Sequence, residues 1–198
     1  MPTDYDIHTA TIDVTAIIGA NILQFEGTGA SDYVGLGITN VALVRQGDST
    51  NTNILINGDF SQPNQPNQGR RYHYYDNIPG WIGLHIEIGF GDIYNAWPNG
   101  IQICELDSEG NYEITQTLTF DSNFQMISSP SNSACLLFFT FDLILQFDWA
   151  PNTVGTQDLL TSQADILWND VILDSIVPNS TTNGVNHKSY TFLYDPCR

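Results

Sequence analysis

The residues best suited to bind a ligand or a partner form one short stretch, Arg70-Arg71-Tyr72-His73-Tyr74-Tyr75. Aromatic and arginine side chains are favoured at protein interfaces. Aromatic rings also stack on the apolar faces of sugars, and arginine hydrogen-bonds sugar hydroxyls. We therefore consider, in this order, a protein interface, tyrosines that fold back onto the domain, and a sugar site. The candidate ligand or interface residues are Arg70, Arg71, Tyr72, Tyr74, Tyr75 and Trp97.

Acidic side chains in carbonyl-rich turns are the candidate metal ligands. Asp32, Asp59 and Asp107 are of this kind, and calcium prefers oxygen ligands. The alternative is that these residues are solvated surface acids. The four histidines are scattered without ligand spacing. Calcium is therefore the one cofactor that the sequence suggests.

Motifs for catalysis are missing from the sequence. It contains no H-E-x-x-H, no G-x-S-x-G and no P-loop. Glu105 and Asp107 are two residues apart and share a strand face, but a glycosidase needs two carboxyl groups that flank a cleft. We expect a protein that is not an enzyme.

The charge balance excludes several partners. Lysine and arginine total 5 against 22 aspartate and glutamate residues, a formal net charge of −17, whereas nucleic acids and anionic membranes require basic surfaces. The most apolar stretch, residues 134–147, contains Asp142 and Gln146 and is too short and too polar to insert into a bilayer. A surface that is poor in charge and rich in polar neutral residues is typical of extracellular proteins. Because the first residues lack a signal peptide, we expect a processed or excerpted form at the cell surface or outside the cell.

Covalent modification has two candidate positions. In a secreted chain, two of the three cysteines Cys104, Cys135 and Cys197 would pair, with Cys104 and Cys135 as the candidate disulfide; the alternative is three buried thiols. Asn179-Ser180-Thr181 is the one N-glycosylation sequon that we find.

The elements that must position these residues are β-strands, because alternation of apolar and polar residues is the dominant pattern. Three segments alternate clearly, and an Asn-Asp pair that tolerates positive φ predicts a tight hairpin. Segment 137–149 is apolar on one face and partly apolar on the other, which is typical of a central strand. The three alternating segments are 10–16, 112–120 and 164–173, the last with its turn at Asn169-Asp170, and the central-strand segment is 137–149.

Pro and Gly separate the strand segments, and no window shows a convincing helical period with caps. Many short strands with regular turns predict an all-β, antiparallel jelly-roll β-sandwich.

From residue 53 onward, an ordered series of motifs resembles a secreted galactose-binding-like jelly-roll family of bacterial surface proteins and plant cell-wall tandem-domain proteins. The series covers about 140 residues. The matching stretches are NILINGDF (53–60), IPGW (78–81), IEI (86–88), GIQICELDS (100–108), ITQT (114–117), LQFDWA (145–150) and ILWNDVIL (166–173). The resemblance implies a jelly roll, a fold that commonly supports carbohydrate binding.

The resemblance also implies that the closing strands are displaced. Members of the family end with a motif like F-x-G-x-G-x-S-D-x-x-G and then I-x-N-V-x-L. Here the similar stretches are residues 23–35 and 38–44, ahead of the main domain. This divides the chain into closing strands at 1–45, a linker at 46–52 and the main jelly-roll sandwich at 53–198.

The displaced strands leave three arrangements open: they complete their own chain as a circular permutant, they complete the next copy, or the chain is one period of a tandem array. Completion of the next copy is strand addition, and a head-to-tail contact that does not close gives a filament. We expect a structural subunit of an extracellular filament or surface coat, with copies of itself as partners. The alternative is a carbohydrate-binding, lectin-like module without catalysis, with glycans as partners.

Overall fold

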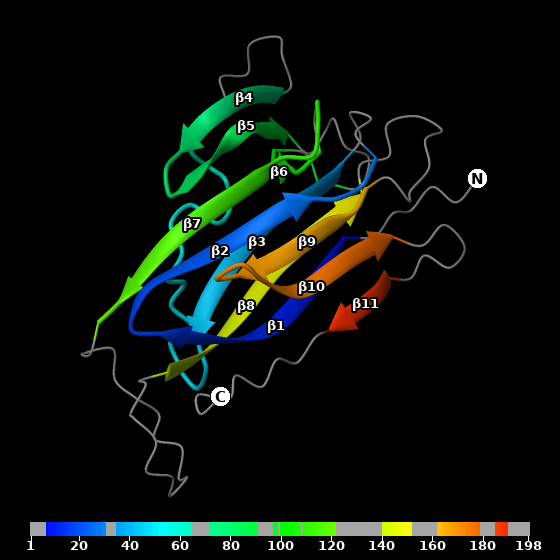
Figure 1. Cartoon of the computed structure of the whole chain (residues 1–198). Coiled ribbons are helices and arrows are strands. Elements are labelled where there is room, and N and C mark those ends of the chain that lie inside the picture. Colours follow the sequence, from blue (N-terminus) through cyan, green and yellow to red (C-terminus); the bar gives the residue numbers. More distant parts are fainter. Residues whose placement is uncertain are drawn as a thin grey trace, which may run out of the picture.

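The structure, a computed structural model, describes residues 7–30, 35–64, 72–90, 97–98, 100–107, 109–121, 140–151, 162–178 and 185–189. Within these residues all the regular structure is β-strand (Figure 1), which confirms the all-β prediction. The strands are β1 (His8–Ile17), β2 (Gly19–Gly27), β3 (Leu36–Arg45), β4 (Tyr72–Ile78), β5 (Trp81–Phe90), β6 (Gln102–Glu105), β7 (Glu113–Phe120), β8 (Thr140–Pro151), β9 (Ala164–Trp168), β10 (Val171–Pro178) and β11 (Val185–Ser189).

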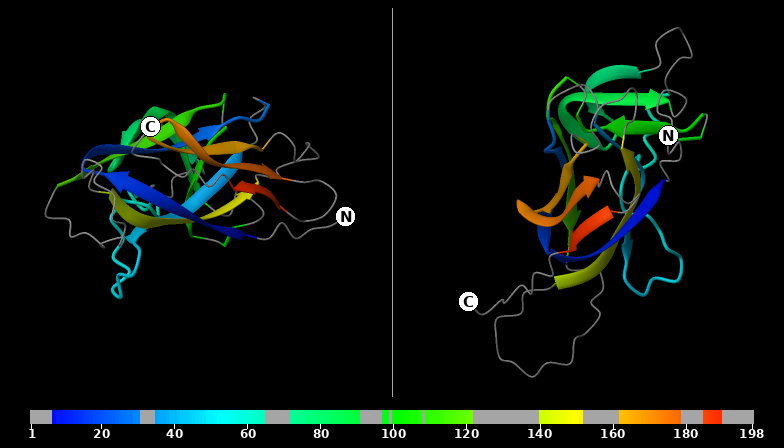
Figure 2. Two further views of the ribbon diagram at one scale, coloured as in Figure 1. Left: turned by 60° about the horizontal axis from the view of Figure 1, so that its bottom comes forward. Right: turned by 90° about the vertical axis from the view of Figure 1, so that its right-hand side faces the viewer.

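All these strands belong to one hydrogen-bonded sheet, which folds into an antiparallel sandwich. Its order is β1-β8-β3-β6-β5-β7-β2-β9-β10-β11, with β4 paired to β5 off this path. Figure 2 shows the two layers, with β1, β8 and β3 in one and β2, β9 and β10 in the other. The ring of Phe25 on β2 meets that of Phe147 on β8 edge-on, with centroids 5.1 Å apart, so the two layers face each other across the core.

Strand β5 passes from one layer to the other. Ile82 and Gly83 pair with β7, whereas residues 87–90 pair with β6. Between these two halves His85 has φ 53, a left-handed conformation that bends the strand. The hairpin partner β4 follows the bend, with a register shift between Tyr75 and Asn77. One strand thus joins the two layers at this side of the sandwich.

The alternation read from the sequence is confirmed by burial. On β7, Ile114, Gln116, Leu118 and Phe120 are buried while the residues between them are exposed or half-buried. On β8, Leu143, Leu145, Phe147 and Trp149 are buried, and β8 lies between β1 and β3 as a central strand. The predicted hairpin turn is also confirmed, because Asn169 and Asp170 both adopt positive φ, 50 and 65, between β9 and β10.

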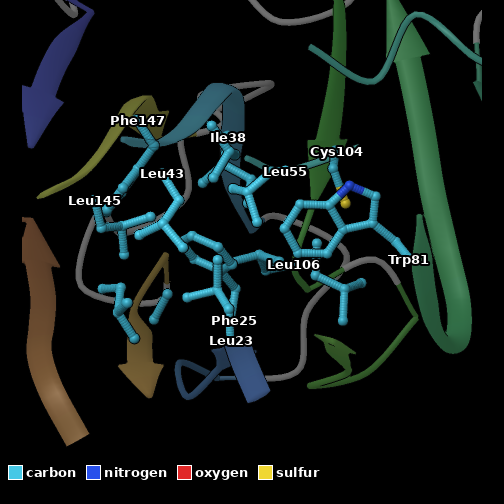
Figure 3. Packing of buried hydrophobic residues seen from close by; sticks show 14 of the residues in the cluster. Leu23, Phe25, Ile38, Leu43, Leu55, Trp81, Cys104, Leu106, Leu145 and Phe147 are labelled. Carbon is cyan, nitrogen blue, oxygen red and sulfur yellow. The ribbon is translucent and has the colours of Figure 1, made fainter. Parts of the chain in front are cut away.

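The core lies between the layers, and N-terminal residues supply much of it (Figure 3). Leu23 and Phe25 of β2 and Ile38 and Leu43 of β3 are 0% exposed. Trp81, also 0% exposed, packs beside Phe25 with ring centroids 6.1 Å apart. Burying a large apolar side chain contributes about 1.5–3 kcal/mol, so β2 and β3 supply core stabilisation that the later strands alone would lack.

The stretch NILINGDF is a strap that lies beside β3, not a strand. Asn53 fixes its start, accepting from the Leu43 and Leu55 N–H groups at 2.9 and 3.0 Å and donating to the Val41 carbonyl at 3.0 Å.

Two glutamines of the other motifs fix the rest of the strap. The Gln116 side chain bonds both the N–H and the carbonyl of Ile56, and Gln102 donates to the Phe60 carbonyl. The Trp81 indole N–H donates to the Asn57 carbonyl at 3.1 Å. The stretches that carry the resemblance therefore meet in space, and these polar residues position the backbone.

Candidate functional site

Two tyrosines of the aromatic and basic stretch lie on the outward face of β4. Tyr72 and Tyr74 pair across the ladder with Gly89 and Glu87 of β5, and their exposed fractions are 41% and 38%. Residues that pair directly across two strands share one face. Because side chains alternate along a strand, Tyr75 points to the other face, where its partner Ile86 belongs to the core.

The row of rings continues beyond β4 through His85 and Tyr112, which are not among the ligand residues predicted from the sequence. The ring centroids of Tyr72 and Tyr74 are 5.6 Å apart, those of Tyr74 and His85 are 5.8 Å apart, and His85 stacks on Tyr112 at 5.1 Å with an interplanar angle of 20°. The His85 side chain is 41% exposed, and Tyr112 is half-buried. We call Tyr72, Tyr74, His85 and Tyr112 the aromatic row.

The bend in β5 places His85 in this row. Its left-handed backbone breaks the alternation of the strand, so that the imidazole reaches both Tyr74 and the residue that precedes β7, Tyr112. Glu109 flanks the row, with its Oε2 atom 3.7 Å from His85 Nδ1 and 47% of its side chain exposed. An aromatic surface with an accessible carboxylate therefore lies at this side of the sandwich.

Two buried glutamates adjoin the row. Glu87 of β5 lies opposite Tyr74 on one side and Glu105 of β6 on the other. Their exposed fractions are only 5% and 4%. The Gly35 N–H donates to Glu105 Oε1 at 2.6 Å. The outward face of β4, β5 and β6 thus carries a tyrosine and two carboxyl groups side by side.

The environment of Tyr74 shows the effect of these acids. Burial of part of its ring raises the pKa of Tyr74 above the ordinary tyrosine value, and the Glu87 carboxylate, through its charge and a hydrogen bond, raises that pKa further. A raised pKa keeps the phenol protonated. Tyr74 therefore offers a neutral ring face and a hydroxyl group.

The other predicted ligand residues have different positions. Tyr75 packs against the core, and burial raises its pKa. Trp97 is 6% exposed and packs with Ile103 and Ala150 in a small cluster. It belongs to that cluster and not to the aromatic row, so its role in binding a ligand or partner stays a prediction. Arg70 and Arg71 lie outside the described residues.

The acids proposed for calcium do not form a metal site among the residues described. Asp107 is fully buried against Gly27 and Gly35, whereas Asp59 is exposed in the strap and accepts from the Ser61 N–H at 3.2 Å. No group of three or more potential ligand side chains occurs in the described ranges. Asp32 lies outside them. Calcium therefore stays a prediction without a ligand set.

The covalent predictions concern one described residue. Cys104 is buried with a free thiol, so the proposed disulfide with Cys135 is not formed in this structure. Burial raises the pKa of the Cys104 thiol well above its ordinary value, and the charges of Glu87 and Glu105 add to this. Cys135, Cys197 and the sequon residue Asn179 lie outside the described residues.

Comparison with known proteins does not identify a family for this chain. The chain matches no family model, and no curated protein and no solved structure resembles it. The galactose-binding-like resemblance thus stays a prediction. Within the described part of the chain, no helix is long and apolar enough to cross a membrane.

Proposed function

We propose that the protein is a non-catalytic carbohydrate-binding module, and that the aromatic row is its binding surface. The observation that carries this proposal is the unbroken contact of four rings over β4, β5 and the residue before β7, with Tyr72 and Tyr74 each more than a third exposed. Exposed rings in contact with one another are costly to leave in water. The aromatic row is therefore better explained as a binding surface than as packing.

The shape and chemistry of the row suit a linear oligosaccharide. Consecutive ring centroids are 5.1 to 5.8 Å apart, so the four rings form one elongated aromatic surface. Tyrosine combines an apolar face with a polar hydroxyl group. Glu109, at the edge of the row, accepts hydrogen bonds from sugar hydroxyls. Such a site holds a sugar by stacking aromatic rings on the sugar's apolar faces and by hydrogen-bonding the hydroxyl groups at the sugar's edge.

The negative charge of the chain favours some classes of sugar ligand over others. With a formal net charge of −17 and Glu109 beside the row, the surface repels uronic and sialic acids. Neutral and amino sugars are the expected ligands. The extracellular or cell-surface location expected from composition belongs to this proposal, because such polymers occur there.

A glycan array followed by isothermal titration of the strongest ligand tests the proposal. Tyr74→Ala should raise Kd about tenfold, or ~1.4 kcal/mol, because it removes a ring from the middle of the row. Tyr74→Phe, which keeps the ring, should retain most of the affinity. Ile82→Ala is the matched control, since Ile82 is 64% exposed on the same hairpin and contributes no ring to the row.

Two results would contradict the proposal. One is an array on which no neutral or amino sugar binds. The other is binding that Tyr74→Ala leaves unchanged. A third assay identifies the competing ligand class: a tetra-arginine peptide that binds the row by cation–π contacts would lose affinity steeply with added salt, whereas stacking of a neutral sugar would not.

A further inference from the structure

The three N-terminal strands have no sheet of their own. Strand β1 pairs with β8, β2 lies between β7 and β9, and β3 lies between β8 and β6. Among the strands that the structure describes, every one that pairs with residues 8–45 begins after residue 100, and no two strands of this segment are neighbours in the sheet. The segment gains its structure only from the later part of a chain.

The later strands depend on the segment in turn. Removal of β2 would leave β7 and β9 each without one antiparallel partner. Removal of β3 would take away the strand that pairs with both β8 and β6. Five wholly buried core side chains would leave with them: Leu23, Phe25, Leu36, Ile38 and Leu43. Open edges and exposed core surface favour pairing with another chain. Each sandwich therefore requires one copy of residues 8–45, from whichever chain supplies it.

One short turn connects the segment to the rest of the chain. Residues 46–52 reverse the direction of the backbone between β3 and the strap, and most of them are exposed. The reversal uses two left-handed residues, Gly47 at φ 78 and Asn51 at φ 48. The Asp48 carboxylate closes the turn, because it accepts hydrogen bonds from the Thr50 N–H at 2.9 Å and from the Thr50 hydroxyl group at 2.8 Å.

We propose that copies of this chain exchange residues 8–45 through opening of the 46–52 turn, so that the partner for this surface is a second copy of the same protein. All contacts of the segment with core and ladders are re-formed with the neighbour, and only the turn differs between the closed and exchanged states. Exchange of an identical element is a low-cost route to association. Each copy donates one segment and accepts one, so exchange in sequence from copy to copy gives an open filament.

Disulfide trapping tests which copy supplies the segment. Thr11 on β1 and Gln146 on β8 are Cα partners, and both are exposed; paired positions in antiparallel strands satisfy the separation that a disulfide needs. Thr11→Cys and Gln146→Cys are introduced together, with Cys135→Ser and Cys197→Ser to remove competing thiols. In the closed chain the bond is intramolecular. In the exchanged state it links copies, and a non-reducing gel shows a ladder of covalent oligomers.

Refolding this protein at increasing concentration should increase the oligomer fraction at least tenfold over a hundredfold range of protein. A fixed single-copy band at all concentrations would overturn the proposal. The turn variant Gly47→Pro with Asn51→Pro sharpens the test, because proline fixes φ near −65° and cannot adopt the left-handed conformation. It should form the ladder even in dilute solution, and a closed monomer would contradict the mechanism.

Asn51→Gly is the matched control, since glycine keeps positive φ available, and it should behave as the parent protein does. Protection of the buried Cys104 thiol from a water-soluble reagent reports that each variant is folded. If the Cys104 thiol reacts in the proline variant, that variant is not folded. The concentration series of the parent protein then tests the proposal without it.

Discussion

Gln116 offers the sharpest test of how the sandwich is held together. It lies on the inward face of β7 and is 3% exposed, although its neighbours on that face, Ile114 and Leu118, are apolar. Its Oε1 atom accepts from the Ile56 N–H at 2.8 Å, and its Nε2 atom donates to the Ile56 carbonyl at 3.0 Å. One side chain thus acts as a strand partner for the strap. We predict that Gln116→Leu destabilises the fold although it makes this face wholly apolar.

The magnitude follows from the two hydrogen bonds. Each contributes a net ~0.5–1.5 kcal/mol, and a buried polar group left without a partner costs about 1–3 kcal/mol. The Ile56 side chain is 61% exposed, so water reaches the strap and reduces the penalty. We therefore expect a loss of about 2 kcal/mol, which for a chain of this size lowers Tm by roughly 4–8 °C.

Urea unfolding followed by tryptophan fluorescence measures the loss. Thr117→Ala is the matched control, because Thr117 is the exposed next residue of the same strand, and it should change stability by less than about 0.5 kcal/mol.

Gln116→Glu adds a pH test. Its carboxylate accepts from the Ile56 N–H but cannot donate to the Ile56 carbonyl, so the folded-state pKa of the new glutamate is raised. The deficit relative to the parent protein should be largest above that pKa and should shrink as the pH falls and the carboxyl group becomes a donor. A negligible cost for Gln116→Leu, or a pH-independent deficit for Gln116→Glu, would refute the reasoning.

Three further predictions concern single residues. Gly80→Ala should destabilise the protein by more than about 2 kcal/mol, measured by urea unfolding, because Gly80 has φ 84 and a Cβ atom there would lie 2.6 Å from the Ile56 carbonyl oxygen. With Cys135→Ser and Cys197→Ser in place, the Cys104 thiol should react with a chromogenic disulfide only on unfolding, since burial raises its pKa; immediate reaction would contradict this. Stability should decline as the pH rises above about 10, the ordinary tyrosine pKa, because the folded-state pKa of Tyr74 is raised and unfolded tyrosine loses its proton first; Tyr74→Phe should reduce that decline in alkaline unfolding curves.

Part of the candidate site could be predicted from the sequence. Tyr72 and Tyr74 are two residues apart, and alternation places them on one face of a strand. The same rule separates Tyr75 from them. His85 and Tyr112 gave no such signal, because their contact depends on the bend of β5 and on the approach of the residue before β7. The burial of Trp97 with Ile103 and Ala150 also gave no signal, because an aromatic residue beside turn residues looks alike in sequence whether it is exposed or buried.

The sequence by itself determined the strands and their inward faces. A period of two and a turn pair such as Asn169-Asp170 are local properties, since they depend on the stereochemistry of adjacent residues, and the structure confirms both. Which strand pairs with which was decided only in the tertiary structure. The same alternating β2 would fit many edges, and its place between β7 and β9 follows from how the layers close around one core. Neighbours far apart in the chain are selected by mutual burial, and no short stretch of sequence records that selection.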